Sequence, residues 1–507
     1  MRIKHIVIIG GGTAGWVTAH NFLNQVPPDI QVSVVTTKEI PIVGVGESTT
    51  GLFNYLINLK NNITGLDEKE FLKETQSTFK LGIKHSDWHT LGKSFYSPLG
   101  DNYYSHQAYP HPTYDHYRIY HIANELEYDE TLQARLMATN RLHYKYNKNI
   151  SPILLAYHLD TYKVGSYLKR KALAVKNCRY IDDQVVTFQQ DEKGYVKYIK
   201  TKTGKTIYGD LFVECSGFTR VLINKAFKNK FISYADNLLV NSALTFNIKN
   251  KEGAPVKNYT HAWAQKYGWL WQIPTQERMG CGYVYSDHFI NATQAQKEIE
   301  SLLGHKIKPQ KKIKFHTGRL EKFWIKNVLS TGLSSAFIEP LEATSIHATL
   351  MQINHFLQNY FKPDLSMECE LLSQQYNSEI TQMWDKIRDF IIFHYITPRK
   401  DTEFWIESSS LKRRSKTLNN LLQVWKYRMP RTVDYVHDIG NNFYTLGNNL
   451  WYQIAIGMKL LSPKLAKKEL KDYNLYDMTA KDYLNLKKIV EDALDNHITT
   501  NNYYDGL

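Results

Sequence analysis

With 507 residues and a mass of 59.1 kDa, the chain exceeds what a single core usually supports, so two or three domains or one large composite are expected. Its hydrophobic fraction of 43% is that of a globular protein, and its formal net charge of +14 favours anionic ligands such as a dinucleotide or a halide. No basic block interleaved with aromatic residues and no segment of membrane-spanning length occurs, so we expect neither a nucleic-acid partner nor a membrane. Four widely spaced cysteines without a CxxC pair predict no metal site and no disulfide framework, which favours a cytoplasmic protein.

The N-terminal segment has the pattern of a nucleotide-binding βαβ unit. A buried strand at residues 4–9 runs into a glycine turn, a helix follows until Pro27 and Pro28, and residues 32–35 form a second strand. Three glycines occupy the GxGxxG positions, namely Gly10, Gly12 and Gly15. The helix that starts at Thr13 and Ala14 offers free N–H groups to phosphates. The acid that commonly binds the ribose is absent, and Thr36 is the candidate in its place.

Later segments predict that this domain is discontinuous. Residues 209–218 form another buried strand, which ends in an acid and a glycine and which we expect to return to the first sheet. Val185 and Val186 lie in a predicted strand beside the same nucleotide. We therefore assign residues 1–365 to a nucleotide-binding domain with inserted substrate-facing segments at 70–150 and 230–330. Residues 366–507 are predicted to form a mainly helical C-terminal module.

Two tryptophans stand one residue apart in the segment Tyr267 to Pro274. Side chains alternate faces along a strand, so Trp269 and Trp271 should project to the same side and build one broad apolar wall. Two interpretations follow from the residues alone. The pair is either part of an ordinary core or a wall of a functional site.

The chain resembles the flavin-dependent halogenases, in particular the tryptophan halogenase branch, along most of its length. The resemblance is carried by the segments GGGTAGW (10–16), VGVGEST (43–49), FKLGIK (79–84), the strand 209–218, GWLWQIP (268–274), GCGYVY (280–285), GLSSAFIEPLEATSI (332–346), and RDF with HY at 388–390 and 394–395. It implies an α/β fold of the two-part flavin monooxygenase and halogenase type, with a Rossmann-like FAD-binding domain and a mainly helical substrate module.

The resemblance also implies the cofactors and partners. Such enzymes use reduced FAD, oxygen and chloride or bromide to make hypohalous acid. A second GxGxxG unit for a nicotinamide is absent from the sequence, so a separate NAD(P)H flavin reductase should supply the reduced flavin. Matches to family positions add Gly46, Glu47, Leu333 and Ile346 to the cofactor-binding residues, and Thr344 with Ser345 as the halide site. A homodimer is left open as the assembly.

Lys80 and Glu342 match the two catalytic residues of the family. The Lys80 ammonium can hydrogen-bond hypohalous acid or, once deprotonated, form a haloamine, and partial burial would favour either role. Glu342 can accept the proton that the halogenated ring loses. The plain alternatives are a surface helix lysine and an acid stabilised by a helix N-terminus. Lys84, one helical turn after Lys80, is expected to be a salt-bridge or solvent residue, and Glu339 competes with Glu342.

In the family, Trp269 and Trp271 would stand between flavin and substrate and prevent direct oxygen transfer. Two other classes of function stay open. A flavin-dependent aromatic monooxygenase would hydroxylate its substrate without needing the lysine. A catalytically idle flavoprotein would act as a binding or redox module.

The substrate positions depart from the free-tryptophan branch. Ser97 and Leu99 stand where that branch has a stacking His and Phe, and the aromatic pair Phe443 and Tyr444 lacks the preceding Glu and tyrosine pair that anchor the amino-acid end. Lost stacking is worth about 1 kcal/mol per pair. Free tryptophan, an indole without the amino-acid end, a tryptophan inside a peptide and another electron-rich ring such as a phenol or pyrrole all stay open. Replacement contacts could come from Tyr103, Tyr104 and His106.

Overall fold

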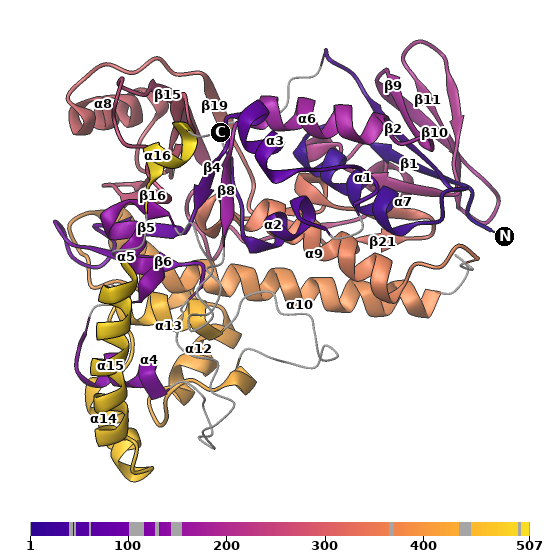
Figure 1. Ribbon diagram of the computed structural model, residues 1–507. Coiled ribbons are helices and arrows are strands. Elements are labelled where there is room, and N and C mark those ends of the chain that lie inside the picture. Colours follow the sequence, from indigo (N-terminus) through magenta and orange to yellow (C-terminus); the bar gives the residue numbers. More distant parts are fainter. Residues whose placement is uncertain are drawn as a thin grey trace. The chain divides into compact units, whose positions relative to one another are not determined.

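The computed structural model describes residues 2–39, 44, 47–59, 62–100, 116–126, 131–142, 155–364, 370–434, 448–494 and 498–505 (Figure 1). The chain divides into two compact units, each assembled from three separate segments. Unit 1 contains residues 1–77, 159–235 and 316–386, and unit 2 contains residues 78–158, 236–315 and 387–507. The predicted domain boundary at residue 366 stays a prediction.

Unit 1 is organised around a six-stranded sheet of order β21-β22-β13-β1-β2-β9. Its strands are β1 (His5–Ile9), β2 (Gln31–Thr36), β9 (Cys178–Asp182), β13 (Leu211–Glu214), β21 (Trp324–Ile325) and β22 (Val328–Ser330). All neighbours pair in parallel except β21 with β22. The central strands carry long apolar side chains with almost no exposed surface, as expected for a parallel sheet covered on both faces. The predicted βαβ opening and the return of residues 211–214 to β1 are confirmed.

Helices and two small sheets complete unit 1. The helices are α1 (Thr13–Gln25), α2 (Gly51–Ile57), α3 (Glu68–Thr75), α6 (Thr161–Leu173), α7 (Ile223–Phe227) and α9 (Thr344–Asn359), with the 3-10 turns η1 (Gly217–Thr219), η2 (Gly332–Ser334) and η3 (Leu341–Ala343). The further strands are β3 (Glu47–Ser48), β10 (Val185–Gln190), β11 (Val196–Thr201), β12 (Thr206–Tyr208), β14 (Phe231–Ser233), β20 (Gly318–Leu320) and β23 (Ala336–Phe337). Helix α1 packs against α6 and α9 (Figure 1).

Unit 2 contains a seven-stranded sheet of order β19-β15-β18-β17-β16-β5-β6. Its strands are β5 (Gly82–Ser86), β6 (Ser94–Pro98), β15 (Ser242–Lys249), β16 (Tyr259–Ala264), β17 (Gly268–Pro274), β18 (Arg278–Tyr285) and β19 (Lys311–Lys314). Unit 2 also contains β4 (Thr78–Lys80), β7 (Arg141–Leu142), β24 (Ile498–Thr499) and most of β8 (Ala156–Leu159).

The register of this sheet determines which side chains share a face. Trp271 is opposite Ala262, Ala262 is opposite His85, and His85 is opposite Phe95. Directly paired residues point to the same side, and residues two apart on one strand do so as well. Trp269, Trp271, His85, Phe95 and Ser97 therefore lie on one face of the sheet. The predicted strand with two tryptophans on the same side is confirmed.

The chain from residue 370 is mainly helical, as predicted. Its helices are α10 (Glu370–His394), α11 (Glu403–Ser408), α12 (Lys416–Val424), α13 (Asn448–Gly457), α14 (Pro463–Asp472), α15 (Tyr476–Leu494) and α16 (Thr500–Asp505), with 3-10 turns η4 (Leu411–Arg413) and η5 (Thr432–Asp434). The first part of α10, up to residue 386, belongs to unit 1, and the chain from residue 387 belongs to unit 2, which contains as well α4 (His116–Ala123), α5 (Leu132–Thr139) and α8 (Ala292–Leu303). Within the described ranges, none of the helices combines the length and apolar character needed to cross a bilayer.

Candidate active site

The turn after β1 depends on glycine for two different reasons. Gly10 has φ +113°, and a Cβ there would lie 2.3 Å from the carbonyl oxygen of Cys215. A Cβ on Gly15 would lie 2.0 Å from the carbonyl oxygen of Gly10. The turn therefore passes close to the end of β13 and to the first turn of α1, which is the purpose of these glycines in dinucleotide-binding folds.

The surroundings of this turn fit a bound FAD. Helix α1 begins at Thr13 with Gly12 as its N-cap residue, and its first turn carries no acidic side chain that would repel a phosphate. A Cβ on Gly332 would lie 2.6 Å from the Cβ of Ala14, so η2, which contains Leu333, lies against the start of α1. Thr36 ends β2, and its methyl group lies over Gly11. The structure thus brings the glycine turn, Thr36 and the segment of Leu333 together in unit 1.

The other predicted cofactor residues have separate positions. Glu47 lies in β3 of unit 1, and burial raises the pKa of its carboxyl group from 4.5 to about 7, although a hydrogen bond with Thr13 partly offsets this rise. Val185 and Val186 begin β10 of a three-stranded antiparallel sheet, where Val186 is 47% exposed. Gly46 falls outside the described residues. Their contacts with the cofactor stay predictions.

The segment before α9 has an unusual backbone. Glu342 has φ +65° and Ala343 has φ +56°, so two successive non-glycine residues adopt the left-handed conformation. Such conformations cost free energy and concentrate at functional sites. These two residues set the direction of the half-buried Glu342 side chain and turn the chain into α9. The first residues of α9 are the predicted halide ligands Thr344 and Ser345. Ile346, in the same first turn, is 7% exposed, and Glu339 is fully buried.

Lys80 lies at the end of β4 in unit 2 and is 1% exposed. The helical spacing expected for Lys80 and Lys84 is wrong, because β4 ends at Lys80 and Lys84 lies in the next strand, β5. The burial that would favour a delivery role is confirmed, and the surface-lysine alternative is excluded. Lys84 is half-buried, with its Nζ 5.9 Å from the centre of the Tyr96 ring.

His158 is a neighbour of Lys80 that the sequence did not reveal. Its Nδ1 lies 3.1 Å from Thr78 Oγ1, its Nε2 lies 3.0 Å from Thr260 Oγ1, and Thr78 Oγ1 donates to the carbonyl oxygen of Pro274. Burial, and to a smaller extent the charge of Lys80, holds the pKa of His158 well below its usual value. A neutral histidine thus links the strand of Lys80 to β16, and Thr78 links the same strand to the end of the tryptophan segment.

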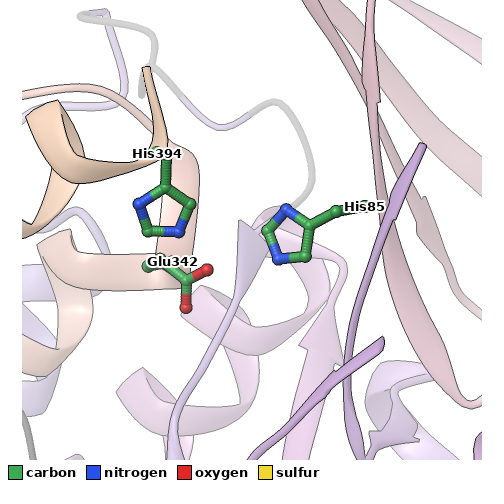
Figure 2. Close-up of side chains that lie close together, drawn as sticks. All are labelled: His85, Glu342 and His394. Atoms are coloured by element: carbon green, nitrogen blue, oxygen red, sulfur yellow. The ribbon is translucent and has the colours of Figure 1, made fainter. Parts of the chain in front are cut away.

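A pair of histidines lies on the tryptophan face of the unit 2 sheet. Figure 2 draws His85 and His394, whose ring centres are 5.6 Å apart, together with the Glu342 of unit 1 described above. His85 is fully buried and stacks on Phe95 with ring centres 4.7 Å apart and an angle of 12° between the planes. No motif in the sequence joins these rings, because His394 lies at the end of α10, far along the chain.

Trp269 and Trp271 are almost completely buried, with 1% and 2% of their surface exposed. Their ring centres are 6.2 Å apart, and Trp88 lies a further 6.2 Å from Trp269. Gly282 is opposite Trp271, and a Cβ there would lie 2.1 Å from the indole, so the ring covers the position left free by the glycine. Trp405 extends the row at 5.7 Å from Trp88.

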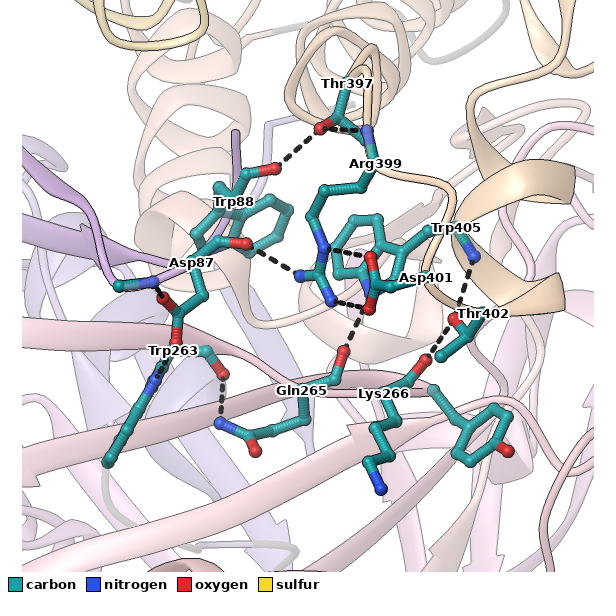
Figure 3. Close-up of polar contacts among 12 residues, drawn as sticks. Asp87, Trp88, Trp263, Gln265, Lys266, Thr397, Arg399, Asp401, Thr402 and Trp405 are labelled. Carbon is teal, nitrogen blue, oxygen red and sulfur yellow. Dashed lines mark hydrogen bonds and ion pairs between the residues drawn. The ribbon is translucent and has the colours of Figure 1, made fainter. Parts of the chain in front are cut away.

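The Trp88 and Trp405 end of this row is held in place by an ion pair between the buried Arg399 and the more exposed Asp401 (Figure 3). The Arg399 guanidinium binds Asp401 through two hydrogen bonds of 2.8 and 2.6 Å, donates to the carbonyl oxygen of Asp87, and lies 4.2 Å from the centre of the Trp405 ring. Thr397 donates to the carbonyl oxygen of Trp88. This planar, bidentate geometry is specific to arginine. It ties the segment 397–405 to the loop that carries Trp88.

The predicted substrate residues are only partly described. Ser97 is buried in β6, and Leu99 follows it with its N–H donating to the carbonyl oxygen of Leu81, the residue after Lys80. Phe443 and Tyr444 fall outside the described residues, as do Tyr103, Tyr104 and His106. The structure therefore brings Ser97 and Leu99 beside the strand of Lys80. The predicted contacts of the other five residues stay untested.

The chain is similar to known proteins along most of its length. Residues 5–471 match the family model of tryptophan halogenases. The chain is 32% identical to tryptophan 6-halogenase ThaL of Streptomyces albogriseolus, with 91% of this chain and 90% of that protein covered. It is 31% identical to tryptophan 7-halogenase RebH of Lentzea aerocolonigenes, with 92% of each chain covered.

Solved structures agree with these relatives. The structure of tryptophan 6-halogenase SttH from Streptomyces toxytricini matches with a TM-score of 0.88 at 25% identity, and both chains are covered completely. Xcc4156, a flavin-dependent halogenase from Xanthomonas campestris, matches with a TM-score of 0.86 at 26% identity over 99% of this chain and 98% of that one. The chain therefore belongs to the tryptophan halogenase family and is a flavin-dependent halogenase, an oxidoreductase that uses oxygen and a halide.

Proposed function

We propose that this enzyme installs chloride or bromide on an electron-rich aromatic ring of the indole or tryptophan type, through hypohalous acid relayed to Lys80. The observation that supports the proposal best is the complete burial of Lys80 beside a histidine that stays neutral. A buried amine without a second positive charge next to it can hold a neutral oxidant away from water.

In this proposal, unit 1 holds the cofactor and the halide. The N–H groups at the start of α1 would bind the phosphates, Thr36 would bind the ribose, and Thr344 with Ser345 would bind the halide at the start of α9. Reduced FAD, when bound, supplies two electrons that, with two from the halide, convert oxygen into hypohalous acid and water. A separate NAD(P)H flavin reductase supplies the reduced flavin.

Unit 2 delivers the halogen in this proposal. The Lys80 amine either hydrogen-bonds hypohalous acid or takes up the halogen as a haloamine with loss of water. The ring attacks this electrophile and then loses a proton, which the Glu342 carboxylate accepts. Trp269 and Trp271 keep the flavin chemistry apart from the ring, so that the ring is halogenated and not hydroxylated. For the substrate, the relatives named tryptophan halogenases support an indole-type ring.

The test compares Lys80→Ala with Lys84→Ala as a matched control. Each enzyme receives FAD, a flavin reductase, NADH, oxygen and chloride or bromide with a mixture of indole-containing compounds, and products are read by mass spectrometry. Wild type and Lys84→Ala should give products with a halogen isotope pattern. Lys80→Ala should bind FAD and consume oxygen but give no halogenated product. Undiminished halogenation by Lys80→Ala would remove the lysine from the mechanism, and hydroxylated products alone would support the monooxygenase alternative.

A further inference from the structure

Helix α13 brings a buried amide against a residue of the predicted substrate region. Ser97 Oγ donates to Gln453 Oε1 over 3.0 Å, and the two residues are 3% and 0% exposed. The Nε2 group of the same amide is buried, and in the described part of the chain it has no hydrogen-bond partner. Leaving a buried donor unsatisfied is unfavourable, so its presence points to a ligand that accepts the bond.

The amide is held in a fixed position. A Cβ on Gly457 would lie 2.3 Å from the Phe95 ring, so α13 approaches β6 closely at this point. Gln453 lies four residues before Gly457 and therefore on the same side of the helix. Phe95 in turn stacks on His85. A side chain that is bonded to Ser97 and carried by a helix packed this closely on β6 loses little conformational entropy when it binds a ligand.

The amide also belongs to the part of unit 2 that carries the predicted chemistry. Ser97 is opposite Ile83 and lies on the same face of the sheet as Trp269 and Trp271. Two residues after Ser97, the N–H of Leu99 donates to the carbonyl oxygen of Leu81, which follows Lys80 in the chain. The unsatisfied Nε2 group thus belongs to an amide that is bonded to β6, and the chain just after β6 is bonded to the residue that follows Lys80.

We propose that Gln453 is a specificity-determining residue of this halogenase, an inference that rests on the proposed function. Its Nε2 group binds a neutral acceptor, the oxygen of a carbonyl or hydroxyl group, beside the electron-rich ring of the substrate. Ser97 is a positioning residue that holds the amide through Oε1. Because Ser97 already donates to Oε1, the group of the amide that lacks a partner among the described residues is the Nε2 donor, which suits a neutral oxygen and not an ammonium group.

The test uses two probes of nearly equal shape, indole-3-acetamide and 3-isobutylindole, of which only the first carries an acceptor oxygen. Binding to the protein with oxidised FAD is measured by isothermal titration calorimetry, and halogenation is measured separately by mass spectrometry. Wild type should bind the acetamide about tenfold more tightly than the isobutyl probe. Gln453→Met should bind both about equally, and Ser97→Ala should lose part of the preference.

Gln265→Met is the matched control, because it removes a buried amide whose Nε2 already donates to the carbonyl oxygen of Trp263. This variant should keep the wild-type preference. Equal binding of both probes by wild type, or an unchanged preference in Gln453→Met, overturns the inference even if both probes are halogenated. A preference for the acetamide that depends on Gln453 supports the inference on binding. If neither probe is then halogenated, the result counts against the proposed function alone.

Discussion

Glu47 shows how one buried carboxyl group couples the start of the predicted flavin site to pH. The residue as a whole keeps some exposure, but its Oε2 is buried and, within the described part of the chain, lacks a hydrogen-bond partner. Burial raises the pKa to about 7, and the hydrogen bond with Thr13 lowers it by less. Near neutral pH the group is therefore partly protonated, next to the first turn of α1.

This raised pKa predicts that unit 1 loses stability as pH rises. Between the unfolded pKa of 4.5 and the folded pKa of about 7, the folded state binds more protons, so the free energy of unfolding falls with increasing pH. Each pH unit between these two pKa values costs about 1.4 kcal/mol of stability, so the loss is at most about 3.5 kcal/mol and is complete about one pH unit above the folded pKa. Glu47→Gln should remove this component, so that the variant gains on wild type between pH 5 and pH 8 in urea unfolding. The control is Glu192→Gln, which changes an exposed carboxyl group. If the free energy of unfolding varies with pH in the same way in wild type and in Glu47→Gln, the prediction is wrong.

Lys80 shows which residue-level features the sequence could predict and which it could not. Its identity as a catalytic candidate followed from the FKLGIK motif. Its strand conformation did not, because the four-residue spacing to Lys84 equally suits a helix. The deciding partner is the distant strand β8, with which β4 pairs so that Lys80 is opposite Ala156. His158 and Gln453 have no motif at all, since their roles arise from contacts with distant strands.

At the level of elements, the β1–α1 turn permits a sharp comparison between two glycines of unit 1. Gly15 meets the carbonyl oxygen of Gly10, whereas Gly165 lies inside α6 with no atom within 4 Å of its absent Cβ. Gly15→Ala should cost about 1–3 kcal/mol of stability through overpacking and weaken FAD binding at least about tenfold. Gly165→Ala should raise stability by about 0.5–1 kcal/mol, because alanine favours a helix, and leave FAD binding unchanged. Thermal unfolding and fluorescence titration with FAD measure both, and equal effects of the two variants would refute this role of Gly15.

Element order was predictable where neighbouring segments pair, and not elsewhere. The strand–turn–helix–strand opening follows from a buried run, a glycine turn and helical spacing, and the structure confirms it within a few residues. The seven-stranded sheet of unit 2 could not be assembled this way. Its β5 pairs in parallel with β16, a strand that begins at Tyr259, and apolar alternation contains no information on such distant partners.

At the scale of the whole molecule, each unit depends on segments from three regions of the chain. The C-terminal end contributes directly to the strand of Lys80, because the N–H of Phe79 donates to Tyr504 Oη over 2.6 Å and the Tyr503 ring packs on Phe79. Thr500 anchors α16 by donating to the carbonyl oxygen of Val256 and accepting from Asn140. The match to the family model ends at residue 471, so this support lies beyond the residues that the family model covers.

This long-range contact predicts that Tyr504→Phe damages halogen delivery more than flavin binding. Without the hydroxyl group, the N–H of Phe79 loses its acceptor in a buried setting, which should cost about 1–2 kcal/mol and loosen β4 next to Lys80. FAD affinity, a property of unit 1, should stay at the wild-type value, while halogenated product per NADH consumed should fall several-fold. The control is Tyr427→Phe, which changes a tyrosine that is 84% exposed. Equal losses of flavin binding and product in Tyr504→Phe would indicate general unfolding, and unchanged product would show that β4 holds Lys80 without the C-terminal helix.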